Sequence, residues 1–257
     1  MGLPANPIKR SLYTHSTGFL ASLSSIILSM YQATLDFVIE GDDHLRILRA
    51  RKQNFIVAVW HTFVDAAVFS LHSRGLCIYS DHPRTRAYEE SWTHFFREIG
   101  IKTIRAQGFE VLDASLGKQS KGIIDFIKII RNGTPALVAP DGPHGPNYES
   151  KPGVLYMAHK SNSVVLPIGV GFSRRVVGPN WDDFALPLPF SRVALTIGPP
   201  IVPDGDDMDD EGMQRQARGL EYELDRLCFR ANDILFGTQE SDKFIESVRL
   251  ARESRLS

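Results

Sequence analysis

Positions 55–72 decide the fold and read FIVAVWHTFVDAAVFSLH. Phe55–Val59 is an unbroken run of apolar residues, rich in β-branched side chains, which is typical of a buried strand. From residue 63 onward the apolar positions follow helical spacing, so the sequence predicts a helix over 63–73. A buried strand that leads directly into a helix is the repeating unit of α/β proteins with a parallel sheet.

The rest of the chain continues this alternation. The other expected strands are Leu76–Tyr79, Lys102–Arg105, Ala136–Ala139, Val164–Val170 and Arg192–Ile197. The other expected helices are 85–98, 119–131, 153–161, Met208–Arg230 and Asp242–Arg252, and residues 172–191 are expected to be irregular. We therefore expect an α/β fold with a largely parallel central sheet flanked by helices, in a single domain, 41–257, that follows an N-terminal segment, 1–40.

Composition excludes several classes of protein. The chain has 257 residues, of which 43% are hydrophobic and 23% charged, so it is neither disordered nor a disulfide miniprotein. A formal net charge of −1 gives no chain-wide basic field for nucleic acid. A mean hydropathy of −0.14 excludes a polytopic membrane protein. Cys77 and Cys228 lie in unrelated contexts without metal-ligand spacing, which favours a reducing compartment.

The N-terminal segment carries a long uncharged stretch. Residues 11–35 contain no Asp, Glu, Lys or Arg, their apolar residues recur near helical spacing, and nine of the 25 are Ser or Thr. An amphipathic helix lying in a membrane interface fits this composition best. A bilayer span, a signal peptide and a helix packed on the protein's own core are the alternatives. The basic residues Arg46, Arg49, Arg51 and Lys52 follow, either as a contact for anionic headgroups or as a solvated helix face.

A histidine and an aspartate follow the first strand of the domain. Parallel α/β folds place their sites at strand ends and in the loops after them. If a helix begins near Thr62, His61 and Asp65 are four positions apart and face each other. An aspartate that orients an imidazole makes it a usable general base near neutral pH, able to take a proton from an acceptor hydroxyl. The alternative is a histidine that caps the helix beside a merely solvated aspartate.

A second candidate region follows the strand Ala136–Ala139. Residues 139–146 read APDGPHGP, a stiff turn that brings Asp141 and His144 to the strand end. Lys151 follows, and the Pro-Gly after it begins a helix whose free N–H groups form a cradle for an anion. The alternative is a rigid surface connection. The sequence has no dinucleotide fingerprint, P-loop, G-x-S-x-G or H-E-x-x-H motif, and we expect neither a cofactor nor a bound metal.

Six short motifs stand in a specific order along the chain. They are Trp60-His61, Pro140-Asp141-Gly142-Pro143, Lys151-Pro152-Gly153-Val154, Leu166-Pro167-Ile168, Trp181-Asp182-Asp183-Phe184 and Pro187-Leu188-Pro189-Phe190-Ser191-Arg192. Their order resembles the lysophospholipid acyltransferase-like superfamily over about residues 40–203. More narrowly, it resembles the bacterial branch catalogued as a domain of unknown function, which includes secondary acyltransferases of lipid A.

The resemblance implies an enzyme, an acyltransferase. It would move a fatty acyl group from an acyl thioester, on coenzyme A or acyl carrier protein, to a hydroxyl of a lysophospholipid or lipid A-type acceptor. His61 would be the general base and Asp65 its orienting partner. The substrate-binding residues that the resemblance implies are Arg105, Asp141, Gly142, His144 and Lys151.

Two departures from the family pattern leave alternatives open. Asp65 follows His61 by four positions where the family has five, so Asp141 is an alternative partner for the histidine. His144 stands where the broader family has an arginine for the acceptor phosphate, and histidine is only partly charged at neutral pH. Either Arg105, Lys151 or Arg174 supplies the anion contact, or the acceptor is not a simple glycerol phosphate.

The same resemblance sets expectations for location and partners. A single span with Lys9 and Arg10 inside would place the domain away from cytosolic acyl donors. We therefore expect a peripheral or monotopic protein on the cytoplasmic face of the inner membrane, with the acyl donor, a lipid acceptor and the membrane surface as partners and no nucleic acid. A non-catalytic lipid-binding protein on the same fold, and a hydrolase that uses His61 on water, are the competing functions.

Overall fold

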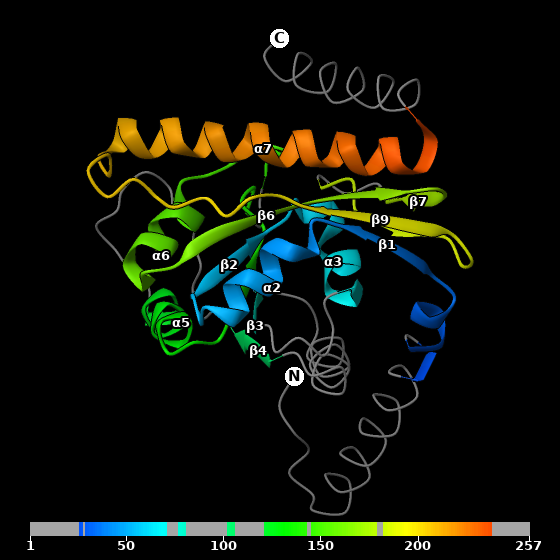
Figure 1. The fold of residues 1–257 in the computed structure, drawn as a ribbon, viewed down its shortest axis with the longest axis horizontal. Helices are drawn as coiled ribbons and strands as arrows, with labels where there is room; N and C mark the ends of the chain where they lie inside the picture. The colour runs from blue at the N-terminus through cyan, green and yellow to red at the C-terminus, as the bar shows by residue number, and fades with distance from the viewer. Residues whose placement is uncertain are drawn as a thin grey trace, which may run out of the picture.

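A computed structural model describes residues 26–27, 29–70, 77–80, 102–105, 121–142, 145–178 and 182–237. Their centre is a seven-stranded sheet with the order β1-β9-β6-β2-β5-β3-β4 (Figure 1). The strands are β1 (Asp36–Glu40), β2 (Phe55–Ala58), β3 (Cys77–Ser80), β4 (Lys102–Arg105), β5 (Ala136–Val138), β6 (Val164–Phe172) and β9 (Arg192–Ile197).

The pairing of these strands confirms the expected α/β fold with a largely parallel sheet. Within the described strands of this sheet, every neighbouring pair is parallel except β6 and β9, which are antiparallel. Every residue of β2 and of β6 is buried, because side chains cover both faces of the sheet there. Unbroken apolar strands such as Phe55–Ala58 are what such a doubly covered sheet requires.

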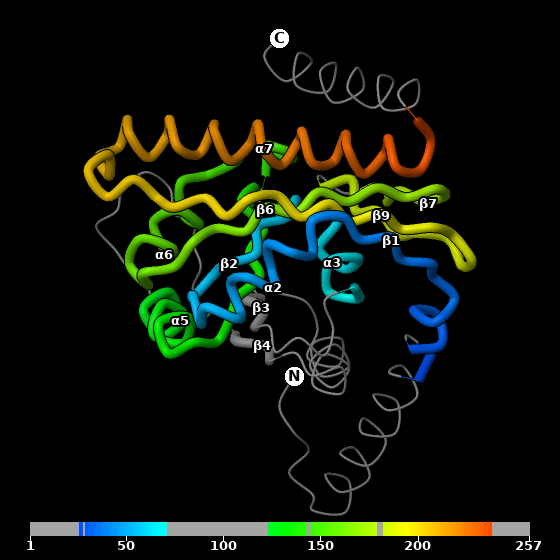
Figure 2. Tube along the Cα trace, viewed as in Figure 1, coloured from blue at the N-terminus to red at the C-terminus, as the bar shows by residue number. Residues whose placement is uncertain are grey.

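Helices flank the sheet, as the path of the chain in Figure 2 shows. They are α2 (Asp42–Ala50), the short 3₁₀ helix η1 (His61–Phe63), α3 (Val64–Ser70), α5 (Lys121–Arg131), α6 (Gly153–Ser161) and α7 (Asp210–Phe236). The longest helix, α7, crosses the top of the molecule in Figure 1. Its first turn is capped by Asp209, whose carboxylate accepts a hydrogen bond of 2.7 Å from the N–H of Gly212.

Two glycines let α7 pack closely on β6. A Cβ atom at Gly169 would lie 2.1 Å from the backbone carbon of Leu227, and one at Gly171 would lie 3.0 Å from that of Ala231. Since the two glycines are two positions apart on a strand, they face the same side of the sheet. The neighbouring strand adds a polar contact, because Thr196 donates a hydrogen bond of 2.6 Å from Oγ1 to the carbonyl of Leu227. The helix is therefore held against the sheet at backbone distance.

Two regions in the later part of the chain differ from the sequence expectations. Residues 172–191, expected to be irregular, contain two short antiparallel strands, β7 (Arg175–Val177) and β8 (Ala185–Pro187). The helix expected over Met208–Arg230 extends to Phe236. Short strands flanked by prolines and charged residues lack the long apolar run that predicts a strand from sequence. In such segments, tertiary contacts decide the conformation.

The N-terminal segment, 1–40, is described only in part. Its last five residues are β1, which pairs with β9 at the edge of the sheet, and residues 29–33 are helical. Within the described residues, no helix combines the length and the apolar character needed to cross a bilayer. The membrane association expected for residues 11–35 stays a prediction, since most of that stretch lies outside the described residues. The expected helices 85–98 and Asp242–Arg252 lie outside them as well.

Candidate active site

The site begins where two parallel strands end side by side. β2 and β5 pair with Ala58 opposite Val138. His61 and Asp141 each follow three residues after these positions, so both reach the carboxyl edge of the sheet. The backbone N–H of His61 donates to the Asp141 carboxylate, with the nitrogen 3.2 Å from Oδ1 and 3.3 Å from Oδ2. Asp141 thus holds the main chain of residue 61 in place.

The imidazole of His61 is oriented by a different carboxylate. Its Nδ1 lies 2.9 Å from Oδ2 of Asp182, a buried residue in the connection between β7 and β8. The second oxygen, Oδ1, accepts a hydrogen bond of 3.3 Å from the N–H of Phe184. A carboxylate oxygen accepts hydrogen bonds, so Nδ1 is the ring nitrogen that donates in this contact, and Nε2 carries the lone pair of the neutral ring. This is the tautomer of a general base.

Burial and charge oppose each other at this histidine. Burial of the ring lowers the pKa of His61 below its usual value near 6.5, because a charged imidazolium is poorly solvated there. The negative charge of Asp182 and its hydrogen bond raise the pKa, with the smaller effect. The imidazole is therefore neutral at physiological pH and ready to accept a proton.

Asp65, expected to orient His61, lies in the first turn of α3. Burial and the nearby negative charge of Asp182 raise its pKa to about 6. A carboxyl group with that pKa is partly protonated close to neutral pH. The catalytic role of Asp65 stays a prediction. In the structure, Asp182 contacts Nδ1 of His61, and Asp141 contacts the backbone N–H of His61.

A small network fixes the segment that carries Asp182. Oγ1 of Thr62 lies 2.5 Å from the backbone oxygen of Asp182 and 3.2 Å from Oδ1 of Asn147. The side-chain amide of Asn147 donates to Oδ2 of Asp183 at 3.3 Å. Thr62 and Asn147 are both buried, where an unsatisfied polar group is costly. The β7–β8 connection is thereby joined to η1 and to the loop after β5.

The loop after β5 folds over Asp141 and Gly142. Gly142 has a φ of +70°, and a Cβ there would lie 3.5 Å from Nζ of Lys151. That amino group donates to the backbone oxygen of Gly145 at 2.6 Å, and the N–H of Lys151 donates to the oxygen of Pro140 at 2.9 Å. Asp141, Gly142 and Lys151, three of the expected substrate-binding residues, therefore occur in one loop. Their binding role stays a prediction.

Asp141, within this loop, is fully buried. Burial raises its pKa to about 7, although hydrogen bonds from backbone N–H groups, that of His61 first among them, and the charge of Lys151 act in the opposite direction. His144 lies outside the described residues. Arg105 is the last residue of β4, and its side chain is not among those described.

Aromatic rings pack together around Trp60, the residue before His61. The ring of Tyr148 meets that of Trp60 edge-on at 5.7 Å and lies 6.5 Å from that of Phe63. Burial raises the pKa of Tyr148, so its hydroxyl stays protonated. The indole N–H of Trp60 donates to Oδ1 of Asp225 at 3.2 Å, which links the strand end to α7. The residue before His61 is therefore fixed by aromatic packing and by a hydrogen bond to α7.

Sequence reasoning missed the roles of Asp182 and Asn147. The only signal for Asp182 was Trp181-Asp182-Asp183-Phe184, an acidic pair between two aromatic residues in a segment expected to be irregular. Its hydrogen bond to His61 joins residues 121 positions apart, and no local spacing reports such a contact. Asn147 lies in a loop where asparagine is also an ordinary turn residue.

Comparisons with known proteins add distant similarities. No family model matches the chain. An uncharacterized protein of Rickettsia prowazekii is 24% identical over 176 residues, which cover 67% of this chain and 76% of that protein. The crystal structure of the 1-acyl-sn-glycerophosphate acyltransferase from Thermotoga maritima aligns with a TM-score of 0.48 at 15% identity, covering 84% of this chain and 88% of that chain.

Proposed function

We propose that the protein transfers a fatty acyl group from acyl-CoA or acyl carrier protein to a hydroxyl of a lysophospholipid or lipid A-type acceptor. The observation that carries this proposal is the 2.9 Å hydrogen bond between Nδ1 of His61 and Oδ2 of Asp182, at the carboxyl edge of a parallel sheet. A neutral, oriented imidazole is the group that deprotonates a hydroxyl. The order of the six motifs supports the same chemistry.

The reaction needs only this base and two positioned substrates. Nε2 of His61 takes the hydroxyl proton as the hydroxyl oxygen attacks the carbonyl carbon of the thioester. The tetrahedral intermediate then breaks its carbon–sulfur bond, and the departing thiolate receives the proton from the imidazolium. The products are an ester and a free thiol, and His61 returns to its neutral form. A thioester is already activated, so proximity and orientation supply much of the remaining rate enhancement.

A thiol nucleophile fits the structure less well. Cys228 lies in α7 and is fully buried, and burial raises its pKa to about 12. The reactive form of cysteine is the thiolate, which such a pKa suppresses at neutral pH. Cys228, the cysteine whose side chain the structure describes, is therefore a poor candidate for an acyl-cysteine intermediate.

The test is an acyl-transfer assay with the purified full-length protein. It uses labelled acyl-CoA and labelled acyl carrier protein as donors, and lysophospholipids and a lipid A precursor as acceptors. We expect one donor and acceptor pair to yield labelled ester and free thiol in equal amounts. Thiol release without ester would support the hydrolase instead, and neither product with any pair would support the non-catalytic lipid-binding protein.

The matched variants are His61→Ala and His159→Ala. Loss of a general base lowers the rate by about a hundredfold to ten-thousandfold. His159 lies in the last turn of α6, away from the hydrogen-bonded pair of His61 and Asp182, so its replacement should leave the rate unchanged. Equal rates for the two variants would exclude His61 as the base.

We extend the proposal to the cytoplasmic face of the inner membrane, where cytosolic thioesters and a membrane-embedded acceptor meet. Cell fractionation of the full-length protein and of a variant lacking residues 1–25 tests this location. The truncation stops at residue 25 because Tyr31 packs edge-on against Phe69 and Asp36–Glu40 forms β1. We expect membrane association for the full chain and partial release for the truncated one. A full-length protein that is found entirely in the soluble fraction would contradict the location.

A further inference from the structure

An exposed aromatic residue stands in a strained turn after β8. Phe190 is 78% exposed and has a φ of +60°. The N–H of Ser191 donates to the backbone oxygen of Leu188 at 3.2 Å, which closes the turn. A positive φ is unfavourable for a bulky residue, and a conformation of this kind persists only where its surroundings fix it. The turn therefore holds a phenyl ring in solvent at an energetic cost.

An arginine in the bend between β6 and β7 fixes this turn. Nη2 of Arg174 donates to the backbone oxygens of Pro189 and Phe190, both at 3.1 Å. The side chain is exposed, and within the part of the chain that the structure describes Arg174 forms no ion pair. A positive charge is thus held at the backbone of the exposed aromatic residue.

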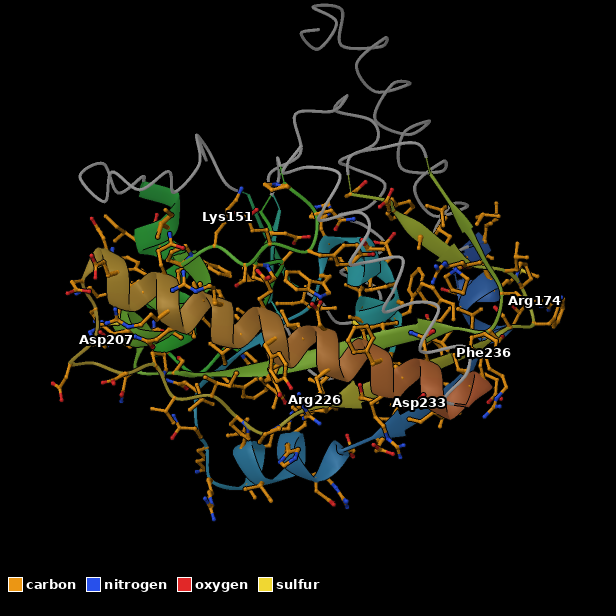
Figure 3. All side chains as sticks on the ribbon, turned by 90° about the horizontal axis from the view of Figure 1, so that it is seen from above. Lys151, Arg174, Asp207, Arg226, Asp233 and Phe236 are labelled. Atoms are coloured by element: carbon orange, nitrogen blue, oxygen red, sulfur yellow. The ribbon has the colours of Figure 1, made fainter. Side chains whose placement is uncertain are left out.

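The small sheet next to this turn exposes further apolar side chains. Val176 and Val177 of β7 are each about half exposed, and Leu188 follows β8 with an exposed side chain. Val176 and Val177 are adjacent on a strand and therefore face opposite sides of this small sheet. We name Val176, Val177, Leu188 and Phe190 together the hairpin patch. In Figure 3 the label of Arg174 lies at the far end of the molecule from that of Asp207, with Phe236 on the same side. The hairpin patch therefore belongs to one end of the domain.

The described part of the uncharged N-terminal stretch, residues 26–27 and 29–35, reaches the same end. The hydroxyl of Tyr31 donates to the backbone oxygen of Pro187, the last residue of β8, at 2.5 Å. Beside Tyr31, the side chains of Ile26, Ile27 and Met30 are exposed, Met30 by 67%. Residues 11–25, which contain no acidic or basic side chain, lead directly into them. Residues 26–31 and the segment after β8 thus both expose apolar side chains, and the hydrogen bond between Tyr31 and Pro187 joins them.

We infer that the hairpin patch and Arg174 dock on a bilayer that contains anionic lipids, with the Phe190 ring entering the interface. An aromatic ring at the headgroup level beside a cation is favoured there, because apolar area is buried while the charge meets lipid phosphates. A second copy of the chain fits less well, since Arg174 would bring its charge against the same charge of the partner unless it found a carboxylate.

The inference goes beyond the proposed reaction, and either can fail alone, because vesicle binding is measured without turnover. It has one geometric consequence for the site. β7 and β8 are paired, and the connection between them carries Asp182, the hydrogen-bond partner of His61. Phe190 lies at one end of this small sheet and Asp182 at the other. A lipid acceptor in a bilayer that contacts Phe190 would therefore be separated from the proposed base by the length of two short strands.

The experiment is a titration of the full-length protein with two kinds of vesicle, one of phosphatidylcholine and one of phosphatidylcholine with phosphatidylglycerol. The first variant is Phe190→Asn, since asparagine tolerates positive φ and the turn should be kept. We expect it to weaken binding to both vesicles about tenfold, from the lost burial of the ring. Arg174→Gln keeps an N–H donor for the turn and removes the charge, so it should weaken binding about fivefold for the vesicles with phosphatidylglycerol only.

Tyr222→Asn is the matched control. Tyr222 is 72% exposed on α7, so the variant removes an exposed aromatic ring outside the hairpin patch and should bind vesicles like the wild type. The inference is overturned if the wild type binds neither vesicle, or if Phe190→Asn binds like Tyr222→Asn. It is also overturned if Phe190→Asn changes the mass measured by sedimentation and leaves vesicle binding intact, because the hairpin patch would then be a contact between two copies.

Discussion

His61 and Asp141 come from the ends of neighbouring parallel strands, whereas Asp182 comes from a connection outside the main sheet. The first two residues are placed by the register of β2 and β5, which the ladder hydrogen bonds and the buried core maintain. Asp182 is placed by side-chain hydrogen bonds from Thr62 and His61 and by the backbone of Phe184. One half of the site is thus part of the framework, and the other half is attached to it. A change in the attached half should alter catalysis while the fold persists.

The largest effect that sharpens this comparison is expected from Asp182→Asn. An amide at this position can offer Nδ1 a donor where it now has an acceptor, which disfavours the catalytic tautomer. We expect kcat to fall about a hundredfold or more. The rate of acyl transfer measures the change, and thermal unfolding of the variant should stay close to that of the wild type.

The companion variant is Asp65→Asn. Because the pKa of Asp65 is raised to about 6, the neutral amide resembles a form that this carboxyl group already adopts. We expect a change in kcat of less than about fivefold. If Asp65→Asn lowered kcat more than Asp182→Asn, Asp65 would be the residue that orients His61.

A change in the framework itself should act on stability. In Gly169→Ala the added Cβ would approach the backbone of Leu227 to 2.1 Å, which forces α7 away from β6. We expect the free energy of unfolding to fall by about 1–3 kcal/mol, as for other overpacked cores. Chemical denaturation measures the loss. Gly219→Ala is the control. Gly219 lies on α7, and an added Cβ there would have nothing within 4 Å, so the variant should be neutral or stabilising.

A smaller effect on activity is expected from Asn147→Ala. The substitution removes the amide that contacts Thr62 and Asp183, so the segment that carries Asp182 loses one of its attachments. We expect kcat to fall about tenfold with KM nearly unchanged, because a misplaced base affects the transition state more than substrate binding. A rise in KM alone would assign Asn147 to substrate binding instead.

The smallest effect is a shift in pH dependence. Burial lowers the pKa of His61, so protonation of the base should reduce kcat/KM only below the usual imidazole value near 6.5. In Asp182→Asn the raising effect of the carboxylate is gone, and the acid limb should move further down. The pH profile of kcat/KM measures both. An acid limb above pH 7 in the wild type would identify a different titrating group.

The framework half could be predicted from sequence because its signals are local. Phe55–Val59 and Ala136–Ala139 are short apolar runs next to turn residues, and parallel pairing brings the residues that follow them to one edge. The expected positions of His61 and Asp141 follow from that rule alone. The sequence predicts the end of α7 six residues too early, because the last turns of the helix are held by packing on β6 through Ala231 and Asn232.

The position of Asp182 could not be predicted from the sequence, for a physical reason. The strands β7 and β8 have three residues each, too few for an alternating pattern to stand out from a loop. Asp182 is bound to residues 61 and 62, more than a hundred positions earlier, through side-chain contacts that depend on the completed fold. An aspartate four positions from His61 was the nearest local partner, and spatial proximity along a helix was the only criterion available.

The contact between Asp141 and residue 61 has a practical consequence. The carboxylate accepts from the backbone N–H of His61, a group that every amino acid except proline possesses. Substitution of the histidine therefore leaves this anchor intact. Position 61 is suited to a genetically encoded non-canonical residue, such as a nitrile-bearing phenylalanine, whose vibrational frequency would report the electric field of Asp182 directly.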